Sequence, residues 1–178
     1  VANILFHVGI IAILLGHFAG LVLPWEIWHA LGISLATKQV IAMGVGGFFG
    51  VLCFIGLTML VKRRLFDPRI RANSSKMDTG ILLLIYLQLI VGMFTIVISS
   101  GHMDGAVMYN LMSWSRYLLT FSPVEAVEFI STVHPVYKFH VTLGITLFVL
   151  FPFSRLVHIW SVHVQYVRRS YQVVRSKA

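Results

Sequence analysis

The sequence predicts an all-α membrane protein, a helical bundle with four transmembrane helices. Composition is the first observation: 58% of the 178 residues are hydrophobic and 11% are charged, whereas about a quarter of the residues of a soluble domain carry charge. The second observation is the presence of four long runs with few or no charged side chains. A helix needs roughly 20 apolar residues to cross the hydrocarbon core of a bilayer, and each run is long enough.

The four predicted spans lie at about residues 4–23, 39–61, 79–98 and 139–160. Their apolar residues are continuous rather than alternating, which is typical of membrane helices and not of membrane-spanning strands. No internal repeat or soluble domain separates them. Residues 1–178 are therefore predicted to form a single transmembrane domain with a cytoplasmic tail at 161–178.

Lysine and arginine residues predict how the chain is oriented. Of the fourteen, six lie in the connection 62–78, and Arg155 with the tail adds five more. Only Lys38, Arg116 and Lys138 lie in the other two connections. Since basic residues collect on the cytoplasmic side, the connection 62–78 and both ends of the chain should face the cytoplasm. Because the basic residues lie beside the apolar spans, the net charge of +8 is explained by the orientation of the chain in the membrane. We therefore expect membrane lipid around the chain and no nucleic-acid partner.

The outward connection 99–138 is long enough to contain short helices at the membrane surface. Residues 105–121 combine apolar side chains with a tryptophan, a residue enriched at that depth. Ser122, Pro123 and Glu125 predict the start of a further helix, with the serine in a capping box.

Small residues in the second span predict close packing of helices. Gly46 and Gly50 form a small-xxx-small pair, which lets two helix backbones approach. Cys53 is the only cysteine, which excludes a disulfide framework, and it is expected to be a buried thiol.

Four of the eight histidines lie in predicted spans: His7 and His17 in the first, His140 and His158 in the fourth. These two spans run in opposite directions, so His7 shares the cytoplasmic depth with His158, and His17 shares the outer depth with His140. Histidine is a common axial ligand of haem iron, and ionisable groups in spans are rare and usually functional. The arrangement predicts two haem b groups with these histidines as iron ligands. The alternative is a haem-free anchor whose histidines only bridge helices.

Several residues beside the four histidines fit these sites. Gly9, Gly16 and Gly144 would give clearance to a porphyrin lying against a helix. Arg155 precedes His158 by one turn and could pair with a haem propionate, or could extend to the membrane surface.

Lys38 stands at the outer end of the second span, within reach of the outer haem. A quinol headgroup needs hydrogen-bond partners there, and a lysine can supply one. A plain interfacial anchor is the alternative.

Most of the chain resembles the gamma subunit of respiratory nitrate reductase, a membrane cytochrome b. The segments that carry the resemblance are NILFHVGIIAILLGHFAG at 3–20, GVLCFIGLTMLVKRRLFDPRIRA at 50–72, HMDG at 102–105 and FHVTLGITLFVLFPFSRLVHIWSV at 139–162. The run LFPFSRLVHIWS is the most specific of them. Residues 122–137 match only loosely.

The resemblance implies a dihaem quinol dehydrogenase that uses menaquinol or ubiquinol in the bacterial cell (inner) membrane. Its partners are a cytoplasmic iron–sulfur subunit and a molybdenum-cofactor subunit that reduces nitrate to nitrite. The implied site residues are His17 and His140 for the outer, distal haem b, His7 and His158 for the inner, proximal haem b, and Lys38 with Gly16 for quinol.

The resemblance also has a departure and a rival. The family has five spans, and its first has no counterpart here, so we expect this sequence to be the remainder of a longer protein. The rival is a dihaem cytochrome b from another quinone-linked complex, such as a hydrogenase, a formate dehydrogenase or a complex of sulfur metabolism.

Overall fold

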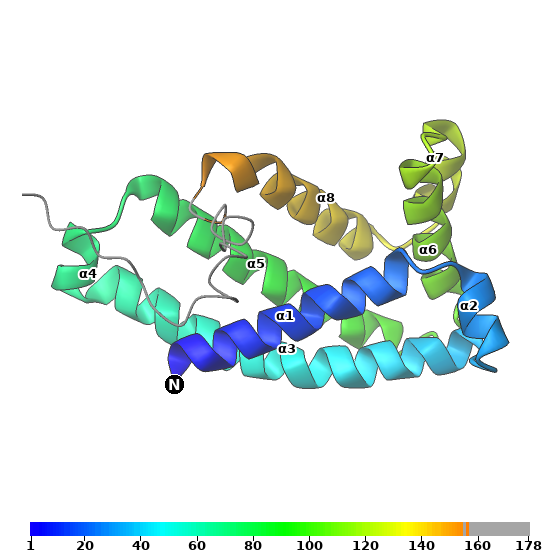
Figure 1. Cartoon of the computed structure of the whole chain (residues 1–178), viewed down its shortest axis with the longest axis horizontal. Helices are drawn as coiled ribbons and strands as arrows, with labels where there is room; N and C mark the ends of the chain where they lie inside the picture. The colour runs from blue at the N-terminus through cyan, green and yellow to red at the C-terminus, as the bar shows by residue number, and fades with distance from the viewer. Residues whose placement is uncertain (155, 157–178) are drawn as a thin grey trace, which may run out of the picture.

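The computed structural model describes residues 1–154 and 156, and this part of the chain is helical and contains no strand (Figure 1). The long helices α1, α3, α5 and α8 pack in sequence order, each on the next. The helices α2, α6 and α7 gather at one end of them and α4 lies at the other. In chain order the elements are α1 (Ala2–Leu21), α2 (Trp25–Ala30), α3 (Leu35–Phe66), α4 (Pro68–Ala72), α5 (Lys76–Ser99), α6 (Ala106–Leu119), α7 (Pro123–Ser131), α8 (Pro135–Leu150) and the 3₁₀ turn η1 (Phe151–Phe153).

Among the described residues, four segments are long and apolar enough to cross a membrane: α1, α3, α5 and the stretch Pro135–Phe153. The predicted class, an all-α membrane protein with four such helices, is therefore confirmed. Successive long helices run in opposite directions, so α1 and α8 are antiparallel (Figure 1).

The third helix, α3, is longer than the apolar run that predicted it. It begins at Leu35 because the hydroxyl of Ser34 accepts a hydrogen bond from the N–H of Thr37 at 3.1 Å, a side-chain cap on its first turn. It continues to Phe66, past the predicted end of the span at residue 61. This early start places Lys38 within the first turns of a regular helix.

The last long helix differs most from its prediction. It starts at Pro135, four residues before the predicted span at 139–160, and the α-helix ends at Leu150. Pro152 lies in η1, and a proline interrupts an α-helix because it lacks an N–H and its ring crowds the preceding turn. The predicted sites at Arg155 and His158 lie outside the described residues.

Helix α1 packs on α3 through glycines that allow the backbones to approach. A Cβ added to Gly9 would lie 2.6 Å from the Cβ of Cys53, and one added to Gly56 would lie 2.5 Å from the backbone nitrogen of Phe6. Cys53 is fully buried, as predicted. Gly9 therefore serves a helix contact, and the expectation that it gives clearance to a porphyrin was wrong.

Only Gly50 of the predicted small-residue pair makes a close helix contact. It faces the sulfur of Met93 on α5, whereas a Cβ added to Gly46 would meet nothing within 4 Å. The core at this level consists of Cys53, Leu57 and Leu89.

The outer surface of the long helices is apolar. Large side chains such as Phe48 and Phe148 are 62% and 76% exposed. In a bilayer these side chains face lipid, so their exposure fits the composition of a membrane protein.

Two helix starts differ from the sequence reading. Ser122 does precede α7, but its side chain makes no capping hydrogen bond, so the predicted capping box is wrong. A complete box occurs instead at the start of α5. There the hydroxyl of Ser75 accepts from the N–H of Asp78, and the Asp78 carboxylate accepts from the N–H of Ser75.

Candidate functional site

His17 of α1 and His140 of α8 lie close together across the bundle. Their ring centroids are 6.0 Å apart and the ring planes are inclined by 35°. Two imidazoles that bind one metal from opposite sides, each with a metal–nitrogen distance of about 2 Å, keep their centroids about 6 Å apart. The spacing therefore fits two ligands that share one iron.

The histidines of α1 present one ring nitrogen away from their helix. The Nδ1 atom of His7 lies 2.7 Å from the carbonyl oxygen of Asn3, and that of His17 lies 2.8 Å from the carbonyl oxygen of Ile13. Nδ1–H then donates to the carbonyl, which leaves the Nε2 lone pair for a metal. Both rings are thus in the tautomer that haem ligation needs. The expected partner of His7, His158, lies outside the described residues.

His140 packs against α5 rather than bonding to its own helix. Its Nε2 lies 3.4 Å from the Nε2 of Gln88. A Cβ added to Gly92 would lie 2.8 Å from the Cε1 of His140, and a Cβ added to Gly144 would lie 3.3 Å from the Nε2 of Gln88. The glycines on the two helices therefore make room for the imidazole and for the amide.

The ammonium group of Lys38 is held inside the protein, and the residue is 3% exposed. Its Nζ donates to the carbonyl of Gly20 at 2.9 Å and contacts the sulfur of Met112. The same atom lies 4.6 Å from the centre of the Trp28 ring. An anchoring lysine instead extends its charge to the membrane surface. Because Gly20 follows His17 by three residues on α1, Lys38 is fixed one turn from the paired imidazoles.

Gly16 shares the face of α1 that Lys38 reaches, since residues four apart on a helix lie on one side. A Cβ added to Gly16 would meet nothing within 4 Å. The space beside this glycine is therefore open.

Within the described residues, three buried side-chain polar atoms have no hydrogen-bond partner: Trp28 Nε1, Gln88 Oε1 and His140 Nδ1. Buried polar atoms nearly always have partners, and exceptions call for an explanation such as a ligand. One of them lies beside Lys38, and the other two belong to the His140 contact. Sequence reasoning missed Trp28 and Gln88, although a glutamine in the middle of an apolar span was a usable signal.

Comparison with known proteins supports one assignment. The family described as nitrate reductase gamma subunit matches residues 1–177. Over 176 residues the chain is 46% identical to the respiratory nitrate reductase 1 gamma chain of Escherichia coli (strain K12), covering 99% of this chain and 77% of the relative. Over 174 residues it is 33% identical to the nitrate reductase gamma chain of Bacillus subtilis (strain 168), covering 98% and 77%.

The chain belongs to the nitrate reductase gamma subunit family. It is accordingly a subunit of an oxidoreductase complex, and its family is the haem-containing subunit of nitrate reductase. Catalytic and iron–sulfur subunits are its implied partners. The assignment favours nitrate reductase over the hydrogenase, formate dehydrogenase and sulfur-metabolism alternatives.

Helices α2, α6 and α7 form a cap beside Lys38. Gln39 of α3 bonds to the segment that leads into α6: its amide donates to the carbonyls of Ser99 and His102 at 3.1 and 2.7 Å, and its carbonyl accepts from the N–H of Gly105 at 3.0 Å. All polar atoms of this buried amide are used. The cap therefore fixes the start of α3, on which Lys38 lies.

An exposed ion pair joins two parts of the cap. Arg116 Nη1 of α6 lies 3.2 Å from Glu26 Oε1 of α2. The pKa of the Glu26 carboxyl is lowered by its own backbone N–H and then by the guanidinium of Arg116. The carboxylate is thus stabilised in its charged form.

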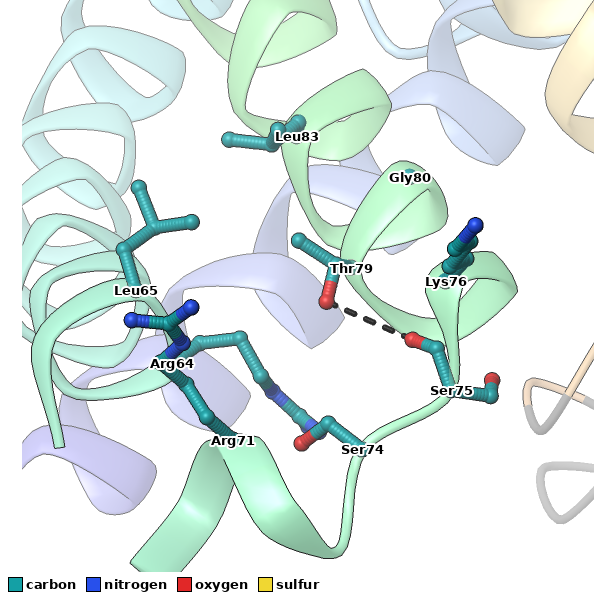
Figure 2. A pocket seen from close by; sticks show the side chains of 9 residues that line it. All are labelled: Arg64, Leu65, Arg71, Ser74, Ser75, Lys76, Thr79, Gly80 and Leu83. Atoms are coloured by element: carbon teal, nitrogen blue, oxygen red, sulfur yellow. Dashed lines mark hydrogen bonds between the residues drawn. The ribbon is translucent and has the colours of Figure 1, made fainter. Parts of the chain in front are cut away.

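The opposite end of the gamma subunit bundle carries a basic pocket of about 670 Å³ between α3, α4 and α5 (Figure 2). Arg64, Arg71 and Lys76 line it, one from each helix, and none of its lining residues is acidic. Arg64 donates to the hydroxyl of Ser74, whereas Arg71 and Lys76 are exposed. The pocket is therefore suited to an anionic surface.

Proposed function

We propose that this gamma subunit oxidises a quinol, menaquinol or ubiquinol, at the outer end of its bundle. The electrons then leave at the cytoplasmic end to an iron–sulfur subunit, and a molybdenum-cofactor subunit reduces nitrate to nitrite. The observation that carries the proposal is the convergence of Lys38 on the turn of α1 that follows His17, which itself lies beside His140.

Two histidine pairs would hold the cofactors, two haem b groups. His17 and His140 are the proposed ligands of the distal haem, and His7 and His158 those of the proximal one. When bound, the haems supply one-electron carriers between the two faces of the membrane. Arg155 is proposed as a partner of a haem propionate.

Lys38 and Gly16 are the proposed quinol-binding residues. An ammonium group has three N–H donors, and two are used on Gly20 and Met112. The third can donate to a quinol oxygen, and the open space beside Gly16 can take the ring. Oxidation of the quinol to a quinone releases two electrons and two protons, and the protons leave on the outer side.

The orientation follows from the same proposal. The basic pocket lined by Arg71 and Lys76 would face the cytoplasm, together with the C-terminus. There it would receive the iron–sulfur subunit, and the whole would lie in the bacterial cell (inner) membrane.

A reduced-minus-oxidised optical spectrum of the complex, titrated against potential, tests the proposal. We expect b-type bands with two components, and His140→Ala should remove one of them and largely spare the other. His134→Ala is the control, because His134 is an exposed histidine at the start of α8 that accepts from the N–H of Val136. Absence of b-type bands in the parent, or loss of both components or neither in His140→Ala, would contradict the proposal.

A further inference from the structure

We infer that Gln88 is a positioning residue for His140: its amide is the hydrogen-bond partner that orients this imidazole and sets the electron density at its iron-binding nitrogen. The inference rests on the proposed function, in which His140 ligates the distal haem. It concerns a residue of α5, a helix that supplies none of the proposed ligands.

Gln88 of α5 and His140 of α8 are in direct contact. Gln88 lies in an apolar span, and its amide meets the ring of His140 at 3.4 Å between the two Nε2 atoms. Gln88 is half-buried, and a bilayer offers its amide no water, so each of its polar atoms needs a partner within the protein. The imidazole of His140 supplies that partner for the amide of Gln88.

His140 lacks the carbonyl partner that the two histidines of α1 have. His7 and His17 each bond through Nδ1 to a carbonyl one turn earlier in α1. The Nδ1 of His140 is buried without a partner, and so is the Oε1 of Gln88. One atom is a potential N–H donor and the other a carbonyl acceptor, on side chains already in contact.

Ligand chemistry explains why the two unpaired atoms matter. A histidine that binds a metal donates its second ring N–H to an acceptor, which fixes the ring orientation and makes the ligand more basic. A glutamine amide offers both a carbonyl oxygen and an NH₂ group. Gln88 can therefore donate to Nε2 of the free imidazole, and once Nε2 is committed to iron its unpaired Oε1 can accept from the N–H at Nδ1.

The packing around the contact supports a dedicated site. Gly92 leaves room for the imidazole and Gly144 leaves room for the amide, since an added Cβ would come within 2.8 Å of the ring and 3.3 Å of the amide nitrogen. Each glycine lies on the helix opposite the group that it accommodates. Both helices are thus shaped for this pair of side chains.

The test is a potentiometric titration of the haems in the whole complex carrying Gln88→Leu or Gln88→Glu. Loss of the acceptor makes the imidazole a weaker donor to iron, so Gln88→Leu should raise the midpoint potential of the distal haem. Gln88→Glu supplies a stronger acceptor and should return that potential to the parental value or lower it. Loss of the distal haem from Gln88→Leu that Gln88→Glu restores would also support the inference.

Tyr86→Phe is the matched control. It removes a polar atom from α5 two residues away, where the hydroxyl of Tyr86 bonds to Thr58 Oγ1 at 3.0 Å and not to His140. We expect no change in either haem potential. Distal potentials unchanged in both Gln88 variants, or loss of the distal haem from both, would overturn the role of Gln88. If the parent complex binds no haem, it is the proposed function that fails.

Discussion

Gly9 of α1 and Cys53 of α3 lie in direct contact, so close that a Cβ on Gly9 would be 2.6 Å from the Cβ of Cys53. The neighbouring atoms are backbone atoms of α3 as well as a side chain, and they cannot move aside without separating the helices. The pairing of α1 with α3 therefore depends on the absence of a side chain at residue 9.

Gly9→Ala should reduce stability by about 1–3 kcal/mol, the usual cost of overpacking a tight core. Thermal unfolding of the detergent-solubilised complex measures the change. Gly44→Ala is the control, because a Cβ on Gly44 would meet nothing within 4 Å. Equal unfolding temperatures for Gly9→Ala and the parent would show that the helices are not packed as described.

Lys38→Ala should weaken the binding of inhibitors that compete with quinol, while both haems stay in place. Loss of a hydrogen bond from a charged donor costs about 1.5–3 kcal/mol, which corresponds to roughly 10- to 100-fold in the inhibition constant. Lys138→Ala is a control of the same type, since Lys138 bonds to the carbonyl of Ser131 at 2.7 Å outside this site. Unchanged inhibition in Lys38→Ala would remove this residue from the quinol site.

Stability should depend slightly on pH through Glu26. Its folded-state pKa lies below the ordinary value of 4.5, so the stabilisation is present above that value and is lost as pH falls through the lowered pKa. The effect should be small, because the pair with Arg116 is exposed. Glu26→Gln should unfold at a slightly lower temperature than the parent at neutral pH, and the difference should vanish in acid. A difference that grows in acid would have the wrong sign.

Neutralising the basic pocket should weaken assembly with the iron–sulfur subunit. In Arg71→Gln/Lys76→Gln, we expect less iron–sulfur subunit to co-purify at low salt, and the deficit relative to the parent should narrow with added salt, which screens the charges that the variant lacks. Lys62→Gln/Arg69→Gln removes the same charge from residues outside the pocket lining and serves as the control. Equal retention by the two double variants would exclude a specific role for the pocket.

The long-range arrangement was predictable from simple features of the sequence. The length of the apolar runs located the membrane helices. The alternating direction of successive helices placed His17 at the depth of His140, and the ring centroids of these two residues are 6.0 Å apart. Lys38 stood out as a single charge at the end of a span. These predictions depend on length and spacing, which tertiary contacts do not change.

Local contacts were not predictable in the same way. The contact between Gln88 and His140 requires knowledge of which faces of α5 and α8 meet, and no periodicity in uniformly apolar helices reveals it. Ser122 fits the capping pattern, but its backbone dihedral angles of −110° and 70° do not give the side-chain bond. The apolar composition of residues 139–160 predicted one continuous helix, but the α-helix ends at Leu150, just before Pro152.

The position of the paired histidines in the chain has a consequence for biosynthesis. His17 is on the first of the described long helices and His140 is on the last. The ribosome must therefore synthesise α8 before the two rings can meet. In the proposed function, the haem at this site can therefore bind both rings only after α8 has been made, and a chain stalled after α5 would contain one of the two histidines without the other.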